Sequence, residues 1–455
     1  MAEPHTQVRW QSRRAFILAV TGAAVGLGNI WRFPYITGEN GGSAFLLQYV
    51  LFILVLGLPV MMAEIMIGRS GRAGPLAALT TLAKANGAST NWRWLAVFGG
   101  LTLFLILSFY AVVSGWSLAY LGKSISGDFV GVSAAEAGGQ FNGFLQDLPL
   151  MLGCHIAFLL MTMVVVARGV SAGLERLNNW LMPLLYLLLL LLAGYAVTTP
   201  GFATALHWLF WPNPDALSWQ VTLDAMGHAF FTLAVGACAL MAYGAYMPEQ
   251  QSLPRAAVAV AVLDVVVALL AGIAIFAVVF SHGMEPAAGP GLMFVTLPVA
   301  FAEVPGGTVW LSAFFVLLVL ATWTSSINLA EPLVAMLVDK HWSRPLAAAV
   351  VGLSVWGLGL LAALSFSLLA DWHPLAFMAV FEGKTLFDLL TSIPPDLFLP
   401  LGGLFIAWFA AKVLSFEQMA AALGSASIAR YWRMTIVWLS IPLLLLILLV
   451  TLYRW

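Results

Sequence analysis

The sequence predicts an all-α, polytopic membrane protein in which two of the membrane-spanning helices are interrupted. The chain is 62% hydrophobic and only 9% charged, whereas soluble domains carry about 25% charged residues. Many of its segments supply the roughly 20 mostly apolar residues that a spanning helix needs. A net charge of −1 argues against binding to nucleic acid. We therefore expect one membrane domain, residues 1–455.

Eleven apolar segments are long enough to be spans, and the basic residues orient them. Their approximate limits are 14–37, 42–70, 94–122, 150–168, 174–197, 219–247, 255–281, 308–340, 345–364, 396–414 and 432–453. With a cytoplasmic N-terminus, 15 of the 19 Lys and Arg residues lie on the cytoplasmic side, where membrane proteins concentrate them. An odd number of spans then places Trp455 outside.

The first span contains three glycines, an asparagine, an arginine and a proline within residues 22–34. Glycine and proline weaken a helix, and freed backbone groups are stable at membrane depth only against protein, water, an ion or a substrate. Residues 231–238 of the sixth span are similarly irregular. Paired interruptions five spans apart are typical of an inverted-repeat transporter. We expect repeats of about 14–197 and 219–414, with an additional helix at 432–453.

Several motifs resemble those of one known family over most of the chain. The strongest is Ala24-Val25-Gly26-Leu27-Gly28-Asn29-Ile30-Trp31-Arg32-Phe33-Pro34, followed by Glu39-Asn40-Gly41-Gly42. Shorter ones are Glu64 with Gly68-Arg69, Arg168-Gly169 with Gly173-Leu174-Glu175, Phe230-Phe231-Thr232-Leu233 and Thr324-Ser325-Ser326-Ile327. The chain resembles the neurotransmitter:sodium symporters, in particular their bacterial amino-acid transporters. The resemblance implies a LeuT-type fold of 5+5 inverted repeats with discontinuous helices 1 and 6, and sodium-driven uptake across the bacterial inner membrane.

The resemblance also implies two sodium sites. The first would use the side chains of Asn29 and Thr232, the carbonyl of Ala24 and the substrate carboxylate. The second would use neutral oxygens: the carbonyls of Gly22 and Val25 in the interrupted first span, and the carbonyl of Ala321 with the hydroxyls of Thr324 and Ser325 in the eighth span. Other interpretations remain open, because membrane Ser and Thr hydroxyls commonly bond to the carbonyl one turn earlier, and an Asn often links two helices.

Asp264 lies in a strongly apolar run, residues 258–279. Ionisable residues are costly in the bilayer and usually functional. Chloride-independent family members have an acidic group near the first sodium site, so we expect no chloride requirement. Several roles remain open for Asp264. It ligates sodium at the first site or lies one shell away, and proton exchange is a further possible role; alternatively, it snorkels to the cytoplasmic face near Arg255.

The substrate site is expected between spans one, three, six and eight. Backbone amides near Leu27 and Gly28, at the end of a half-helix, and the hydroxyl of Tyr110 would hold a carboxylate. Taken alone, Tyr110 is also consistent with an aromatic residue of the core or of the membrane interface. Carbonyls of span six would hold the ammonium group. The expected residues are Ala24, Gly26, Leu27, Gly28, Ile106, Tyr110, Phe231, Thr232, Ala234, Val235, Ala237, Ser325 and Leu329. None of these residues is charged, so a charged substrate side chain would be buried without a partner of opposite charge. Because Ala237 is small, we predict neutral, hydrophobic amino acids, with room for aromatic ones.

Gates follow from the same resemblance. Outside, Arg32 would pair with Asp388 or Asp396, and Phe231 would close over the substrate. Inside, Trp10 with Arg9 or Arg13 would pack against Asp339, unless these residues are ordinary juxtamembrane anchors. The acidic side chains of Glu64 and Glu331 are expected to satisfy broken-helix backbone or to interact with each other.

Alternative functions differ in what they require. An intramembrane enzyme needs a nucleophile–base pair or a metal cluster, and the sequence has no such spacing, so we expect no enzyme. A channel, a transport-dead amino-acid sensor and a proton-coupled transporter that uses Asp264 remain alternatives. The expected partners are an amino acid, sodium ions and the lipid bilayer, with no nucleic acid and no obligate protein partner.

Overall fold

Helices form the whole architecture of the part that the computed structural model describes, residues 13–248, 250–286 and 289–454. The first half of the chain forms α1 (Arg13–Ala24), α2 (Phe33–Glu39), α3 (Ser43–Phe52), α4 (Leu58–Gly71), α5 (Pro75–Ala85), α6 (Arg93–Ser126), α7 (Ala134–Gln146), α8 (Leu148–Ala167), α9 (Arg176–Val197) and α10 (Phe202–Phe210). The second half forms α11 (Trp219–Thr232), α12 (Ala239–Ala245), α13 (Leu253–Ser281), α14 (Thr296–Ala302), α15 (Gly307–Val338), α16 (Arg344–Leu364), α17 (Leu386–Ile393), α18 (Leu399–Lys412), α19 (Phe416–Leu423), α20 (Ala426–Thr435) and α21 (Ile441–Arg454).

The number of spans depends on how the broken helices are counted. Within the described residues, nine helical stretches are long and apolar enough to cross a membrane, and the pair formed by α1 and α2, bent by 43°, makes a tenth. The two pieces of the sixth predicted span, α11 and α12, have 14 and 7 residues and are each too short to qualify. The all-α polytopic fold is confirmed, but the predicted number of eleven spans is not.

The tenth predicted span begins earlier than expected. Its helical stretch runs from Leu386 to Lys412 rather than from residue 396. The predicted limits of 396–414 place Pro394 and Pro395 just before this span, since proline lacks the backbone N–H that continues a helix. In the structure both prolines lie in a wider π-helical turn, Pro394–Phe398, which joins α17 to α18 without interrupting the stretch.

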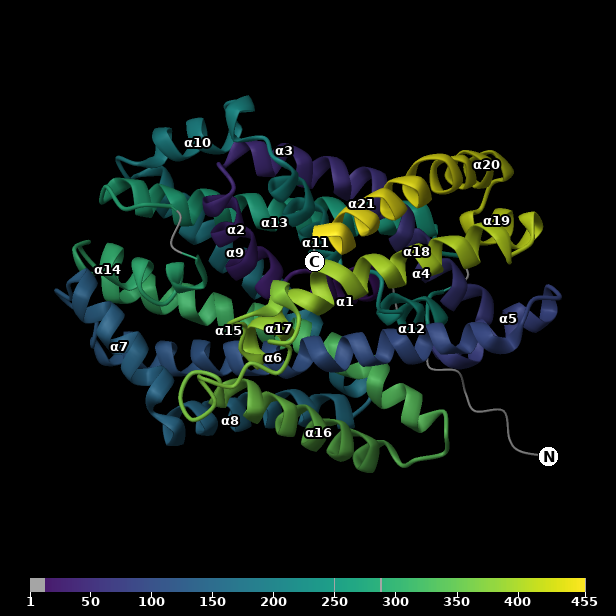
Figure 1. Cartoon of the computed structure of the whole chain (residues 1–455), viewed down its shortest axis with the longest axis horizontal. Helices are drawn as coiled ribbons and strands as arrows, with labels where there is room; N and C mark the ends of the chain where they lie inside the picture. Colours follow the sequence, from purple (N-terminus) through teal and green to yellow (C-terminus); the bar gives the residue numbers. More distant parts are fainter. Residues whose placement is uncertain (1–12, 249, 287–288, 455) are drawn as a thin grey trace.

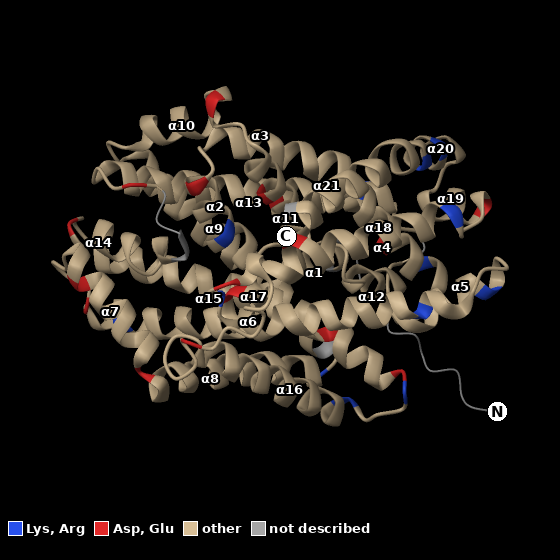
Figure 2. Cartoon of the chain, in the orientation of Figure 1, with Lys and Arg blue, Asp and Glu red and all other residues tan. Residues whose placement is uncertain are grey.

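The long helices pack side by side around the two broken ones (Figure 1). The longest helix, α6, packs against α15, α8 and α16, while α1 packs against α15, α13 and α9. The pieces of the broken sixth span have different neighbours, because α11 packs on α3 and α12 on α4. Figure 2 shows that most Lys and Arg residues lie at the end that carries α5, α19 and α20, whereas the opposite end, with α7, α10 and α14, carries mainly Asp and Glu.

Both predicted interruptions are present. The helical hydrogen bonding of α1 ends at Ala24, and a π-helical turn, Gly28–Arg32, leads into α2. The helix α11 ends at Thr232, and residues 233–238 form an irregular segment before α12. In this segment Ala234 and Cys238 have positive φ angles of 52° and 60°, which L-residues with a side chain rarely adopt.

Other helices stabilise the irregular segment of the sixth span. The carboxylate of Glu64 on α4 accepts hydrogen bonds from the backbone N–H groups of Gly236 (2.5 Å) and Leu240 (3.0 Å). The backbone of Leu399 on α18 approaches Gly236 so closely that a Cβ there would collide with it. Glu64 therefore satisfies broken-helix backbone, as predicted, and places a carboxylate at the positive end of α12.

Candidate functional site

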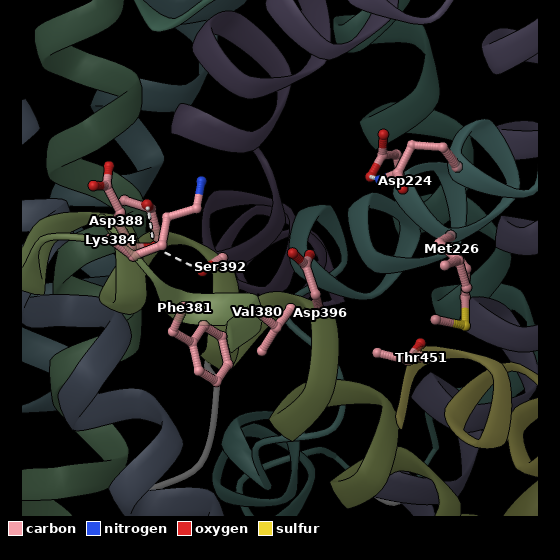
Figure 3. Close-up of a pocket in the computed structure, with 12 residues that line it drawn as sticks. Asp224, Met226, Val380, Phe381, Lys384, Asp388, Ser392, Asp396 and Thr451 are labelled. Carbon is pink, nitrogen blue, oxygen red and sulfur yellow. Dashed lines mark hydrogen bonds between the residues drawn. The ribbon is translucent and has the colours of Figure 1, made fainter. Parts of the chain in front are cut away.

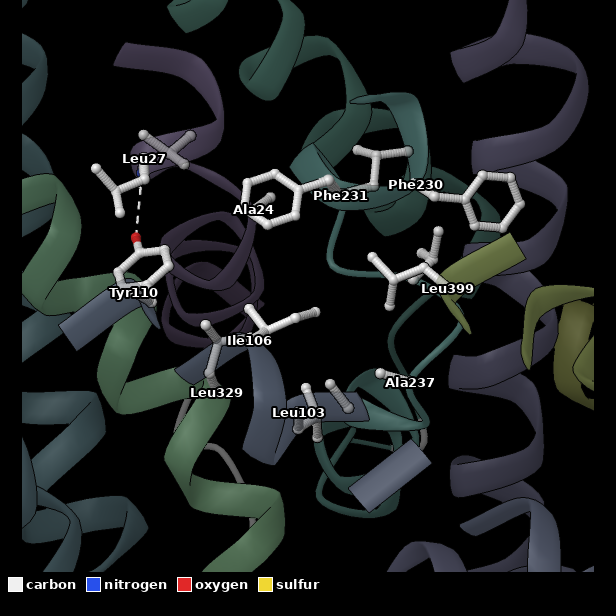
Figure 4. Close-up of a cluster of buried hydrophobic side chains, with 14 of the residues drawn as sticks. Ala24, Leu27, Leu103, Ile106, Tyr110, Phe230, Phe231, Ala237, Leu329 and Leu399 are labelled. Carbon is white, nitrogen blue, oxygen red and sulfur yellow. Dashed lines mark hydrogen bonds between the residues drawn. The ribbon is translucent and has the colours of Figure 1, made fainter. Parts of the chain in front are cut away.

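The two interruptions face each other across a small buried cavity (Figure 4). Its walls come from the break after α1, from α6, from the end of α11 and the segment that follows, from α15 and from α18. The lining residues are Ala23, Ala24, Gly26, Leu27, Gly28, Leu103, Ile106, Tyr110, Phe231, Ala234, Ala237, Ser325, Leu329 and Leu399. No charged side chain lines the cavity among the described residues. Its free volume is about 20 Å³, close to the space that one water needs, so the lining must separate to admit an amino acid.

The structure brings most of the predicted substrate residues together, with two exceptions. Thr232 and Val235 do not line the cavity. Thr232 instead contacts Asp264, 3.0 Å away. Val235 lies in the irregular segment after α11, directly after Ala234 with its positive φ of 52°, so the position of its side chain does not follow from the geometry of α11.

Backbone groups of the first break are exposed to the polar side chains that surround the cavity. The N–H of Leu27 donates a hydrogen bond to the hydroxyl of Tyr110 (3.1 Å), and the N–H of Gly26 donates to Oδ1 of Asn29 (3.0 Å). A Cβ at Gly26 would collide with the hydroxyls of Tyr110 and Ser325. Glycine at this position therefore allows both hydroxyls to approach the unwound backbone.

Asp264 on α13 lies at the centre of a buried polar cluster. Its Oδ1 accepts hydrogen bonds from Nδ2 of Asn29 (2.7 Å) and from the hydroxyl of Thr232 (3.0 Å), and its Oδ2 accepts one from the hydroxyl of Tyr49 (3.2 Å). Its side chain is fully buried. The interpretation that Asp264 snorkels to the cytoplasmic face is therefore wrong, because the carboxylate points into the break rather than toward a helix end.

A second polar cluster joins α15 to the first break. The hydroxyl of Ser325 donates hydrogen bonds to the carbonyls of Val25 (2.8 Å) and Gly22 (3.1 Å). The hydroxyl of Thr324 bonds within its own helix, to Ala321 (3.0 Å). Thr324 thus follows the common behaviour of membrane threonines, while Ser325 connects two helices.

An ion pair covers the cavity on one side. Arg32 donates a hydrogen bond to Asp396 over 2.9 Å, and its guanidinium carbon lies 4.9 Å from the centre of the Phe231 ring. Asp388 instead completes the capping box of α17, accepting hydrogen bonds from the N–H (2.9 Å) and the hydroxyl (2.8 Å) of Thr385. Of the two acids considered for the external gate, Asp396 pairs with Arg32 and Asp388 does not.

Beyond this pair lies a larger pocket of about 550 Å³ (Figure 3). Its polar rim includes Asp224, Lys384, Asp388 and Asp396. The Arg32–Asp396 pair and the Phe231 ring therefore separate a polar outer pocket from the apolar inner cavity.

Comparison with known proteins identifies the family. The sequence profile of the sodium:neurotransmitter symporter family matches residues 7–132 and 138–455. The chain belongs to the sodium:neurotransmitter symporter family. Its family and fold are those of transporters, not of enzymes.

Two bacterial relatives and one solved structure match this chain over nearly their full length. It is 35% identical over 421 residues to the sodium-dependent transporter YhdH of Bacillus subtilis (strain 168), which covers 92% of this chain and 91% of that protein. It is 30% identical over 455 residues to a sodium-dependent transporter of Haemophilus influenzae, covering 97% of each. The crystal structure of MhsT in complex with L-phenylalanine matches with a TM-score of 0.89 and 40% identity, covering 97% of this chain and 99% of that one. The LeuT-type fold with discontinuous helices 1 and 6 is thereby confirmed.

The predicted internal gate is only partly within the described structure. Trp10 and Arg9 lie outside the described residues, as does the side chain of Arg13. Asp339 follows the last residue of α15 and packs against Gly74. Burial raises the pKa of the Asp339 carboxyl.

Glu331 has a different partner from the one predicted. Its carboxylate forms an ion pair with Arg344 at the start of α16, and Arg344 also donates a hydrogen bond to the carbonyl of Val166 (2.8 Å). Within the described residues, this carboxylate is hydrogen-bonded to Arg344 and not to Glu64 or to broken-helix backbone. The pair therefore joins α15, α16 and the end of α8.

Four residues of the site were missed by the sequence analysis, and one of them, Ala23, directly precedes the predicted Ala24. Leu103 precedes Ile106 and Tyr110 by three and seven residues, so it lies on the same face of α6 and helical spacing could have identified it. Tyr49 bonds to Asp264 from α3, and Leu399 reaches the cavity from α18. Neither has a local sequence pattern that links it to the site.

Proposed function

We propose that this chain is a symporter that imports neutral, hydrophobic amino acids with sodium by alternating access, and that aromatic side chains are accepted. The observation that carries the proposal is the enclosed cavity between two helix breaks, lined by apolar side chains together with the hydroxyls of Tyr110 and Ser325. A carboxylate would replace Tyr110 as the partner of the Leu27 N–H, while apolar walls would bury the substrate side chain. The relation to MhsT, whose crystal structure contains L-phenylalanine, supports this substrate class.

We also propose two sodium sites and no chloride requirement. The first would comprise Asn29, Thr232, Asp264 and the carbonyl of Ala24, because the first three side chains already converge. The second would comprise the carbonyls of Gly22, Val25 and Ala321 with Thr324 and Ser325, supported by the short distances from Ser325 to the two carbonyls of the first break. The negative charge of Asp264 would replace the charge that chloride supplies elsewhere in the family.

In the mechanism that follows from this proposal, the substrate is moved across the membrane and no covalent bond in it is formed or broken. Sodium and substrate would bind from outside after the Arg32–Asp396 pair separates, and the pair would then close behind them. The two repeats, about 14–197 and 219–414, would rearrange to open the opposite side, with the C-terminal helix outside both. One charge that moves down a potential of 100 mV releases about 2.3 kcal/mol, which corresponds to roughly fiftyfold accumulation of substrate.

We propose that the N-terminus is cytoplasmic, in the inner membrane of a bacterium. The basic end of the molecule, with α5, α19 and α20, would then face the cytoplasm (Figure 2). Alternating access in this orientation gives uptake, because the Arg32–Asp396 pair faces outward.

Uptake by purified protein in proteoliposomes tests this proposal. The panel would comprise L-phenylalanine, L-leucine, L-alanine, L-lysine and L-glutamate, each with an inward sodium gradient, with potassium only, and with a pH gradient without sodium. We expect sodium-dependent uptake of the neutral, hydrophobic members. Uptake driven by the pH gradient alone would favour a proton-coupled transporter, and sodium-dependent binding without uptake would favour a sensor. Preference for lysine or glutamate would overturn the substrate assignment.

A further inference from the structure

The amide of Asn178 on α9 is buried without a partner. Its side chain is 1% exposed, and neither its Oδ1 nor its Nδ2 has a hydrogen-bond partner within the described part of the chain. A buried amide that makes no hydrogen bond destabilises a protein, and in a lipid environment no bulk water reaches it. A polar group in this situation points to a ligand or water that completes its bonding.

Asn178 lies directly beside the first helix break. A Cβ on Gly22 would lie 3.3 Å from Oδ1 of Asn178 and 3.3 Å from Nδ2 of Asn328, so the two amides converge on one face of α1. The carbonyl of Gly22 accepts a hydrogen bond from Ser325 (3.1 Å) and belongs to the proposed second sodium site.

Asn178 can be placed on one side of the second sodium site along the membrane normal. Asn178 is the third residue of α9, which begins at Arg176. Arg168 and Arg176 flank the loop before α9 that the distribution of basic residues places in the cytoplasm. In the proposed topology the N-terminal end of α1 faces the cytoplasm, so Asn178 lies between the second sodium site and the inside.

The neighbouring polar groups differ in whether they are already bonded. Nδ2 of Asn328 donates to the carbonyl of Thr324 (2.7 Å), and its Oδ1 accepts from Tyr243. The hydroxyl of Thr21, one residue before Gly22, is buried without a partner in the described structure, like Asn178. Amide and hydroxyl oxygens are neutral, hard donors of the kind that suit an alkali cation.

We propose that Oδ1 of Asn178 is a transient ligand for the sodium ion that leaves the second site toward the N-terminal end of α1. This inference rests on the proposed function. A neutral oxygen replaces one ligand of the departing ion without the strong attraction by which a carboxylate would retain it. Asn178 thereby increases the rate of sodium release and contributes little to sodium affinity.

Stopped-flow dilution of sodium alone, followed by intrinsic tryptophan fluorescence, tests this role in the purified full-length protein. We expect Asn178→Leu and Asn178→Ala to slow the sodium-release phase about tenfold, the effect of losing roughly one ligand interaction. The sodium concentration for half-saturation should change less than about twofold. Asn178→Ser, which retains a smaller oxygen acceptor, should release sodium near the wild-type rate. Asn179→Ala is the matched control, because Asn179 is the next residue of α9 and is exposed.

Each result has a defined meaning. Wild-type release rates in both Asn178→Leu and Asn178→Ala would overturn the proposal and leave Asn178 as a group that binds water only. Equal slowing in Asn178→Ser and in the two apolar variants would also overturn it, since loss of packing would then explain the change. Thermal unfolding of every variant identifies any that does not fold, and the remaining apolar variant then decides. Absence of any sodium response in the wild-type protein would instead overturn the proposed function, and this inference with it.

Discussion

Arg32 and Asp396 are 364 residues apart in the chain, yet their side chains form a 2.9 Å ion pair directly beside the ring of Phe231. Arg32 has 7% of its side chain exposed and Asp396 has 33%. Removing the carboxylate would leave a buried guanidinium without its charged partner, which costs more than the pair contributes when intact. The pair is therefore suited to an external gate: the closed state is stable, and a state in which Arg32 stays buried without Asp396 is destabilised.

The first prediction concerns this gate. Asp396→Asn should lower the free energy of unfolding by about 2 kcal/mol and accelerate dissociation of bound substrate to the outside. The control is Asp388→Asn, which alters the capping box of α17 and should change stability by less than about 1 kcal/mol. Thermal unfolding and the rate of substrate dissociation measure the two effects. Equal acceleration in both variants would show that Asp396 has no special role in closing the site.

The second prediction concerns Asp264. Asp264→Asn removes the negative charge that three hydroxyl and amide donors surround, so the sodium concentration for half-maximal substrate binding should rise about tenfold. The variant should also gain a dependence on chloride, because an anion can then supply the missing charge. Substrate binding measured across sodium concentrations, in chloride and in gluconate, checks both effects. The exposed Asp215→Asn is the control; a wild-type sodium dependence in Asp264→Asn would exclude Asp264 from the first site.

The third prediction separates two adjacent serines on α15. Ser325→Ala should raise the sodium requirement about tenfold, because Ser325 contacts the carbonyls of Gly22 and Val25. Ser326→Ala should have little effect on sodium, because Ser326 contacts Thr162 (2.8 Å) and not the first break. Sodium titrations of substrate binding compare the two. Similar shifts in both variants would contradict a second sodium site at Ser325.

Local sequence patterns explain which parts of the site could be predicted. The breaks follow from residues whose backbone chemistry opposes a membrane helix, and Gly26 is required by the hydroxyls that approach it. Asn29 and Asp264 stood out because polar side chains are rare in apolar runs, and the structure brings them within 2.7 Å. Such features are properties of single residues, so they can be predicted from the sequence without knowledge of the fold.

The remaining features depend on how distant elements meet. Val235 was assigned to the substrate site from the family resemblance, and its actual position depends on the irregular backbone around Ala234, whose φ is 52°. Leu399 reaches the cavity only because the backbone of α18 packs against Gly236. Asp388 lies in the first turn of α17 and Asp396 in the π-helical turn that follows α17, and only the packing of this turn decides which of the two acids meets Arg32.

The fourth prediction concerns Glu64. A Gln at this position keeps one acceptor oxygen and presents an NH₂ group to a backbone N–H, so one of Gly236 and Leu240 loses its hydrogen bond. Glu64→Gln should lower the free energy of unfolding by about 1–3 kcal/mol. Thermal unfolding measures this, with Glu39→Gln as the control, because Glu39 is exposed. No difference between the two variants would mean that the irregular segment does not depend on Glu64.

The fifth prediction concerns the size of the substrate side chain. Ala237 lines a cavity whose free volume is about 20 Å³, and its own small side chain leaves the space that a large substrate would need once the walls separate. Ala237→Phe should therefore weaken binding of L-phenylalanine about tenfold or more, since overpacking a close-packed site costs about 1–3 kcal/mol. Binding of L-alanine should weaken by less than about threefold, because its methyl group does not reach the new ring.

Ala237→Val provides the matched comparison for this prediction. Because valine is intermediate in size, its effect on L-phenylalanine binding should lie between those of alanine and phenylalanine at position 237, while L-alanine binding stays nearly constant. Competition binding with both amino acids at saturating sodium measures the series. If residue 237 sterically bounds the substrate side chain, the loss of binding affinity must increase with the size of residue 237 and with the size of the substrate side chain. Equal losses for both substrates would instead mean that Ala237 supports the irregular backbone between α11 and α12 and does not bound the substrate side chain.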